Sequence, residues 1–94
     1  MGKTTDGKSV VGGMFRVHET YGIPLELIIE QLFKHSYIID WIDFYEESVT
    51  YGWNPRTTLS KIEMSLLDTL GKEYSLEVIK RLKYHIVKRY HDNG

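Results

Sequence analysis

The N-terminal nine residues contain a pattern typical of phosphate-binding loops. Residues 2–9 read G-K-T-T-D-G-K-S, which fits G-x-x-x-x-G-K-[ST] at every position. Phosphate binding by this loop requires a buried strand before it and a helix after it, so that backbone N–H groups converge on the anion. Only Met1 precedes the motif, and the later chain shows no parallel-sheet pattern. We therefore expect residues 1–9 to form a flexible polar tail and not a nucleotide site.

A basic face on the last predicted helix is the first candidate for binding chemistry. Its members at i, i+3, i+4 and i+7 are Arg81, Tyr84, His85 and Lys88, and Lys80, Lys83 and Arg89 flank them. Such a stripe can neutralise phosphates, and a tyrosine within it can stack on a base or sugar. The alternative is a solvated face whose cations complement the C-terminal end of the helix dipole.

A second candidate is the turn at residues 52–55, G-W-N-P, and the helix that follows it. In helix-turn-helix units the second helix presents its N-terminal residues to base edges. The hydrogen-bond donors available there are Arg56, Thr57, Thr58, Ser60 and Lys61. The preceding helix is acidic and would repel phosphates unless its charged face points away. A plain antiparallel helical corner remains the alternative.

The acidic helix itself could serve a protein partner. Asp40, Asp43 and Glu47 follow at i, i+3 and i+7, with Glu46 beside them. A carboxylate strip of this kind is usually solvated, but it could also mimic a phosphate backbone or contact a basic protein. Trp53, if exposed beside Arg56, would anchor such a partner.

Other chemistry finds little support in the residue types. The four histidines, His18, His35, His85 and His91, lack the i, i+4 pairing that places two imidazoles on one helix face. The chain has no cysteine, and no nucleophile–base pattern stands out in its 94 residues. We therefore expect a protein that is not an enzyme and that has neither a metal site nor a cofactor.

Apolar periodicity predicts an all-α fold, a compact bundle of four or five short helices in a single domain at 10–94. The predicted helices cover residues 10–21, 25–35, 40–51, 57–70 and 75–90, and residues 36–39 could interrupt the second. Gly22 suits a helix stop, Pro24 a first helical turn, and Thr57 or Thr58 and Ser75 the N-caps. No hairpin signal appears.

The charge distribution is segregated although the net charge is only −1. Residues 15–51 hold two basic and seven acidic side chains, whereas residues 52–94 hold eight basic and five acidic ones. The apolar runs are too short to span a bilayer, so no membrane partner is expected. The absence of cysteine fits a cytoplasmic location.

Residues 15–27, F-R-V-H-E-T-Y-G-I-P-L-E-L, resemble a segment of alanyl-tRNA synthetases of the form F-[KR]-L-Y-D-T-Y-G-F-P-L-[DE]-L. In that family the segment opens the helical region that helps to recognise the tRNA acceptor stem. The resemblance continues to about residue 48, with departures at His18, Ile23 and Ile28. It implies a helical piece that docks RNA or another helix, whereas the ATP-binding and editing residues of the family have no counterpart. Independent convergence on a helix–Gly–Pro–helix corner is the alternative reading.

These observations predict a small non-enzymatic helical protein that binds nucleic acid or has a regulatory role. It would contact tRNA or duplex DNA through the C-terminal helix and the corner at residues 53–61. The alternative is a protein-interaction module, an adaptor or an inhibitor of a larger enzyme, that uses its segregated acidic and basic faces. The sequence leaves the oligomeric state open.

Overall fold

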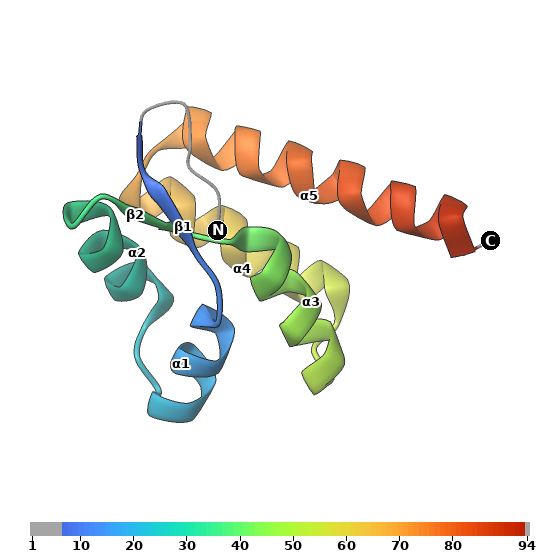
Figure 1. Ribbon diagram of the computed structural model, residues 1–94, viewed down its shortest axis with the longest axis horizontal. Helices are drawn as coiled ribbons and strands as arrows, with labels where there is room; N and C mark the ends of the chain where they lie inside the picture. Colours follow the sequence, from blue (N-terminus) through green and yellow to red (C-terminus); the bar gives the residue numbers. More distant parts are fainter. Residues whose placement is uncertain (1–6, 94) are drawn as a thin grey trace.

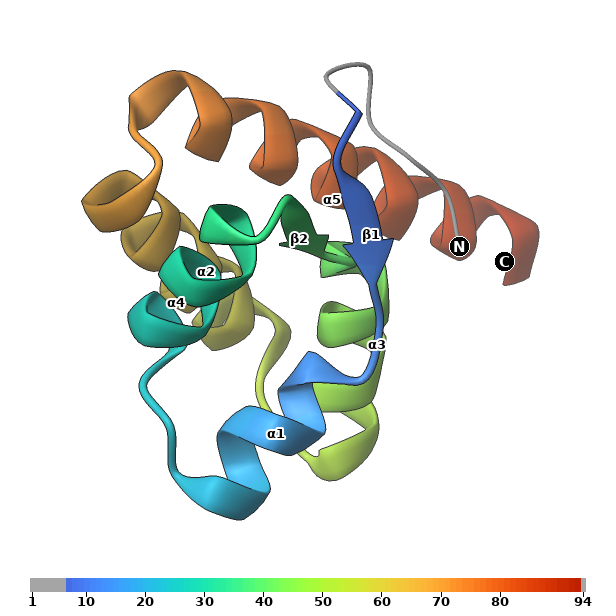
Figure 2. The same ribbon diagram turned by 60° about the vertical axis from the view of Figure 1, so that its left-hand side comes forward.

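The computed structural model describes residues 7–93 and contains five helices and two short strands within them. Along the chain these are β1 (Ser9–Val11), α1 (Met14–Tyr21), α2 (Leu25–Lys34), β2 (Tyr37–Ile39), α3 (Trp41–Tyr51), α4 (Pro55–Thr69) and α5 (Lys72–Asn93). Figures 1 and 2 show the helices packed around one another, with the strand pair lying across them. The predicted all-α helical bundle is confirmed.

The strand pair corrects the predicted start of the first helix. Val10 and Val11 belong to β1, which pairs in parallel with β2 in the register Val10↔Ile38. The helix starts only at Met14 because Gly13 adopts a left-handed conformation (φ 79°). Three residues per strand are too few to show an alternating pattern in the sequence. Ser9, the last residue of the predicted tail, lies in β1, whereas residues 1–6 lie outside the described part.

The phosphate-loop pattern is only partly within the described residues. Its last three residues, Gly7, Lys8 and Ser9, lead into β1 and not into a helix. The expectation that the remaining positions form a tail concerns residues outside the described range.

The N-caps predicted for the last two helices, Thr57 or Thr58 and Ser75, are wrong. Asn54 caps α4 by accepting a hydrogen bond of 2.9 Å from the Arg56 N–H, and Pro55 occupies the first turn. The α5 helix begins at Lys72, so Ser75 lies inside it, and its hydroxyl donates to the Glu63 carbonyl at 3.1 Å. Residue types that suit a cap also suit a buried position when a carbonyl is within reach.

The core is formed by all five helices and by β2. Its buried apolar residues are Phe15, Leu25, Ile28, Ile29, Ile39, Trp41, Phe44, Tyr45, Ile62, Leu66, Ile79 and Leu82. The α5 helix packs mainly on α4 and also on α3, and its C-terminal end extends past the other helices (Figure 1). Among residues 7–93, no helix is both long enough and apolar enough to cross a membrane.

Candidate nucleic-acid interface

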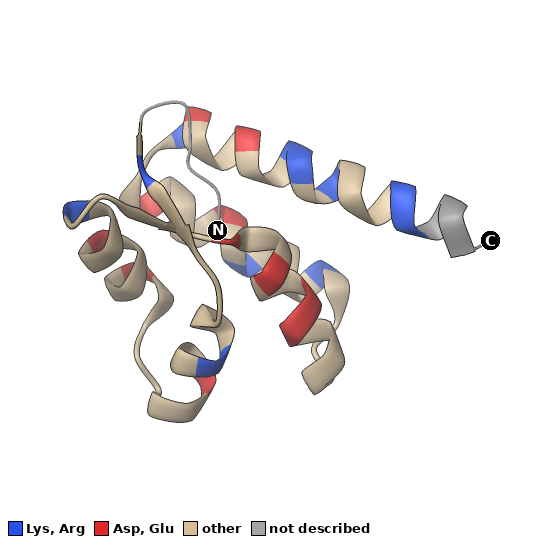
Figure 3. Cartoon of the chain, in the orientation of Figure 1, with Lys and Arg blue, Asp and Glu red and all other residues tan. Residues whose placement is uncertain are grey.

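The solvent side of α5 carries three lysines and a tyrosine, here called the outer face and defined as Lys80, Lys83, Tyr84 and Lys88. All four side chains are exposed, and that of Tyr84 is 71% exposed. The opposite side of the helix places Ile79 and Leu82 in the core, and this burial fixes the rotation of α5. Figure 3 shows the basic positions following one another along α5.

The lysines of the outer face form no ion pairs within the described part of the chain. Within the described part of the chain, the ion pairs involve Arg16, His85 and Arg89, and none involves Lys80, Lys83 or Lys88. Their positive charge therefore faces solvent and is available to a polyanion.

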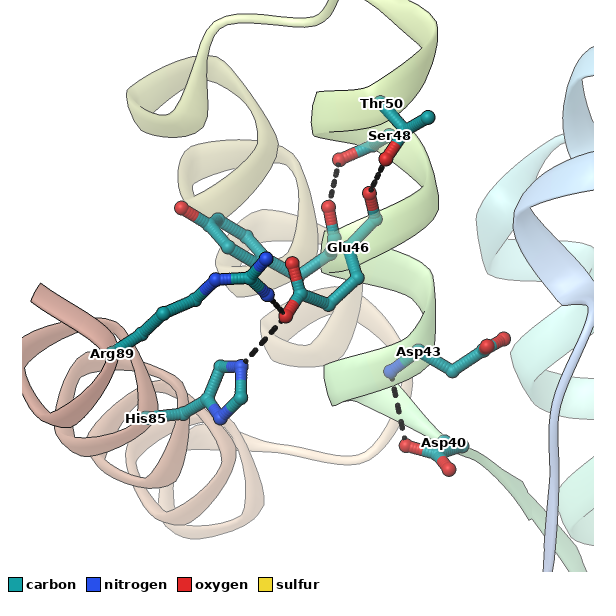
Figure 4. Close-up of polar contacts among 8 residues, drawn as sticks. Asp40, Asp43, Glu46, Ser48, Thr50, His85 and Arg89 are labelled. Carbon is teal, nitrogen blue, oxygen red and sulfur yellow. Dashed lines mark hydrogen bonds and ion pairs between the residues drawn. The ribbon is translucent and has the colours of Figure 1, made fainter. Parts of the chain in front are cut away.

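His85 and Arg89, unlike the lysines of the outer face, contact a carboxylate of the described chain. His85 is half-buried, with Nε2 3.1 Å from Oε1 of Glu46 in α3, and the Arg89 guanidinium donates to the same oxygen (Figure 4). One carboxylate of α3 thus contacts two basic side chains of α5. The ring of His85 thus lies at the α3–α5 contact, and its contact with nucleic acid stays a prediction. Arg81 is exposed beside a groove that also has Glu77 in its wall.

The predicted corner at residues 53–61 contributes less than its sequence indicates. Thr58 is completely buried, its Oγ1 lying 3.0 Å from Oγ of Ser48, so it cannot reach a ligand. The Lys61 Nζ lies 5.1 Å from the centroid of the Trp53 ring, a cation–π contact. Arg56 is exposed at the start of α4. Arg56 and Lys61 are therefore the cations that the corner offers.

Trp53 is half-buried and acts in packing. Its ring meets Phe15 edge to face at 5.0 Å between centroids and lies 6.1 Å from the ring of His18. These contacts fix the turn between α3 and α4 onto α1. An anchor for a partner would need the ring to be free, so the sequence-based role for Trp53 loses its basis.

The acidic strip of α3 is used within the molecule. Asp40 caps the helix by accepting from the Asp43 N–H at 3.1 Å, and Asp43 accepts from the Gly13 N–H at 2.8 Å. Glu47 lies 3.9 Å from Arg16, a weak contact between partly exposed groups. A basic protein would have to compete with these contacts to bind the strip predicted as a partner surface.

Sequence reasoning missed an open groove between the strand pair, the start of α3 and α5. The groove has a volume of about 740 Å³. Tyr74, Val78 and Leu82 follow at i, i+4 and i+8 along its α5 wall. That spacing can be read from the sequence. The opposite wall cannot, because it comes from residues more than thirty positions earlier. Within residues 7–93, no group of three His, Asp or Glu side chains is arranged to hold a metal ion.

Comparison with known proteins gives a partial similarity. No protein-family model and no solved structure matches the chain. An alanine–tRNA ligase from Prochlorococcus marinus (strain AS9601) is 31% identical over 71 residues, which are 73% of this chain. The chain spans only 8% of the length of that ligase. The resemblance to a segment of alanyl-tRNA synthetases is thereby confirmed as a weak and partial similarity.

Proposed function

We propose that this protein is a small, non-enzymatic, nucleic-acid-binding protein that contacts RNA or DNA through the outer face of α5. The observation that carries the proposal is the row of exposed lysines, Lys80, Lys83 and Lys88, none of which forms an ion pair within the described chain. Tyr84 lies among them with its ring open to solvent.

The dimensions of the outer face suit a phosphate backbone. From Lys80 to Lys88 the helix rises by about 12 Å. One strand of a duplex carries a phosphate roughly every 3.4 Å of its axis. Three lysines with flexible side chains can therefore reach three phosphates of one strand. The exposed ring of Tyr84 can stack on an unpaired base, a contact that tolerates any base.

Two further observations support the proposal. Glu46 of α3 contacts His85 and Arg89 of α5, so part of its negative charge is compensated within the molecule. The partial similarity to an alanine–tRNA ligase makes tRNA the first ligand to test, with duplex DNA for comparison. Arg56 and Lys61 supply a second, smaller set of cations at the start of α4.

Reversing the charge of the outer face tests the proposal. The variant Lys83→Glu/Lys88→Glu should bind tRNA at least tenfold more weakly at low salt, measured by fluorescence anisotropy. Because two phosphate contacts are lost, the slope of log K against log salt should become shallower by about 1.4 to 1.8. Lys34→Glu/Lys72→Glu changes the net charge equally at exposed lysines away from the outer face and should bind as the wild type does.

Two results would contradict the proposal. The first is the absence of binding to tRNA, single-stranded RNA and duplex DNA at low salt. The second is an equal loss of affinity in both double variants, because that result would mean that net charge alone governs binding.

A further inference from the structure

The groove between α5 and the strand pair has a volume of about 740 Å³ and serves none of the functions above. One wall is the stripe Tyr74, Val78 and Leu82 on α5. The other consists of apolar residues from the two strands and the start of α3, namely Val10, Ile38, Ile39, Trp41 and Ile42. This second wall is apolar, and one of its side chains, Ile42, is 41% exposed to solvent. An open apolar hollow of about 740 Å³ has the size of sites that take ligands.

The charged residues of the groove are predominantly acidic. Asp40, Glu73 and Glu77 line it, and Arg81 is its one cation among the described lining residues. Glu73 and Glu77 are exposed, and neither takes part in an ion pair of the described chain. The groove therefore repels phosphates and attracts cations, which is the reverse of the outer face of the same helix.

The geometry of the wall indicates the form of an occupant. The α5 residues that line the groove from Glu73 to Arg81 span about 12 Å of the helix, or slightly more than two turns, while Leu82 below them is completely buried. A partner helix that places apolar side chains at i, i+3 or i+4, and i+7 presents anchors over a similar distance. Basic residues beside those anchors would lie against Glu73 and Glu77.

We propose that this groove binds an amphipathic helix of another protein, with an apolar stripe flanked by lysine or arginine. The inference goes beyond nucleic-acid binding and does not depend on it, because the groove carboxylates Glu73 and Glu77 precede the lysines of the outer face along α5 and carry the opposite charge.

Two labelled helical peptides with one leucine stripe test the proposal. One carries lysines beside the stripe, and the other carries glutamates at the same positions. In anisotropy titrations the lysine peptide should bind the wild-type protein at least tenfold more tightly. Glu73→Lys/Glu77→Lys should reverse this preference. Glu30→Lys/Asp68→Lys makes the same change of net charge at exposed positions outside the groove and should preserve it.

A second pair of measurements locates the binding. Trp41 lines the groove, so in a Trp53→Phe background its fluorescence should shift to shorter wavelength when the lysine peptide binds. Ile42→Glu places a charge on a side chain that is already 41% exposed, and it should abolish peptide binding while the circular dichroism spectrum stays that of a folded helical protein.

Equal affinity for the two peptides would overturn the proposal, as would equal weakening by the two charge-reversal variants. Analytical ultracentrifugation of the wild-type protein and of Ile42→Glu tests for a different occupant. If the wild-type protein is a dimer and the variant is a monomer, the groove binds a second copy of this chain. Binding of a small apolar dye that the lysine peptide fails to displace would assign it to a small molecule. Each of these two results would also overturn the proposal.

Discussion

Asp43 accepts a hydrogen bond of 2.8 Å from the backbone N–H of Gly13, a residue thirty positions earlier in the chain. The contact joins the start of α1 to the first turn of α3. It depends on backbone space as well as on charge, because a Cβ at the neighbouring Gly12 would lie 3.3 Å from Oδ2 of Asp43. The carboxylate therefore has a structural role.

Replacing Asp43 should destabilise the fold. Asp43→Ala leaves the part-buried Gly13 N–H without its acceptor, and we expect the free energy of unfolding to fall by about 1–3 kcal/mol. Urea denaturation followed by circular dichroism measures this change. Glu47→Ala is the matched control, because its contact with the exposed Arg16 is worth at most about 1 kcal/mol. Equal losses in the two variants would contradict the role assigned to Asp43.

The buried hydroxyl pair between α3 and α4 gives a second test. Ser48 Oγ donates to the Tyr45 carbonyl at 2.7 Å and lies 3.0 Å from Thr58 Oγ1. Thr58→Val keeps the shape but removes one hydroxyl, and it should cost about 1 kcal/mol in thermal or urea unfolding. Thr57→Val changes an exposed neighbour in the same way and should leave stability nearly unchanged. A neutral Thr58→Val would mean that the pair contributes nothing.

Glu46 links the fold to the proposed function. Glu46→Gln removes the carboxylate that contacts His85 and Arg89, so it adds one net positive charge near α5. Because these groups are partly exposed, unfolding free energy should change by no more than about 1 kcal/mol. Nucleic-acid affinity at low salt should rise several-fold, measured by anisotropy. A lower affinity would show that Glu46 acts by positioning Arg89 for the ligand and would contradict the role given to the outer face.

Tyr84 should matter only to binding. Tyr84→Ala removes a side chain that is 71% exposed, so stability should be unaffected. Affinity for single-stranded RNA should fall about 5- to 150-fold, which corresponds to the loss of one stacked base, roughly 1–3 kcal/mol. Tyr21→Ala removes an equally exposed tyrosine, 74% exposed, at the end of α1 and should change neither property. Anisotropy titrations measure the RNA affinity of both variants, and thermal unfolding measures their stability. Equal losses of affinity in the two variants would contradict the role of Tyr84.

Local rules predicted much of the fold from the sequence. The apolar repeat placed four of the five helices close to their observed positions, and Gly22 ends α1 in the left-handed conformation expected of it. The basic character of α5 could also be read from the sequence, but the predicted stripe of Arg81, Tyr84, His85 and Lys88 shares only Tyr84 and Lys88 with the outer face. Such features depend on neighbours within about two turns.

The tertiary structure decided which of the charged and polar residues remain free. Asp43, Glu46 and Thr58 looked like surface groups in the sequence, yet their partners are Gly13, His85, Arg89 and Ser48, which lie 10 to 43 positions away. The groove likewise arises where β1, β2 and α3 face α5. Helical periodicity specifies the side of a helix but not the residue that packs against it. Those pairings become fixed only when the helices bury their apolar stripes together.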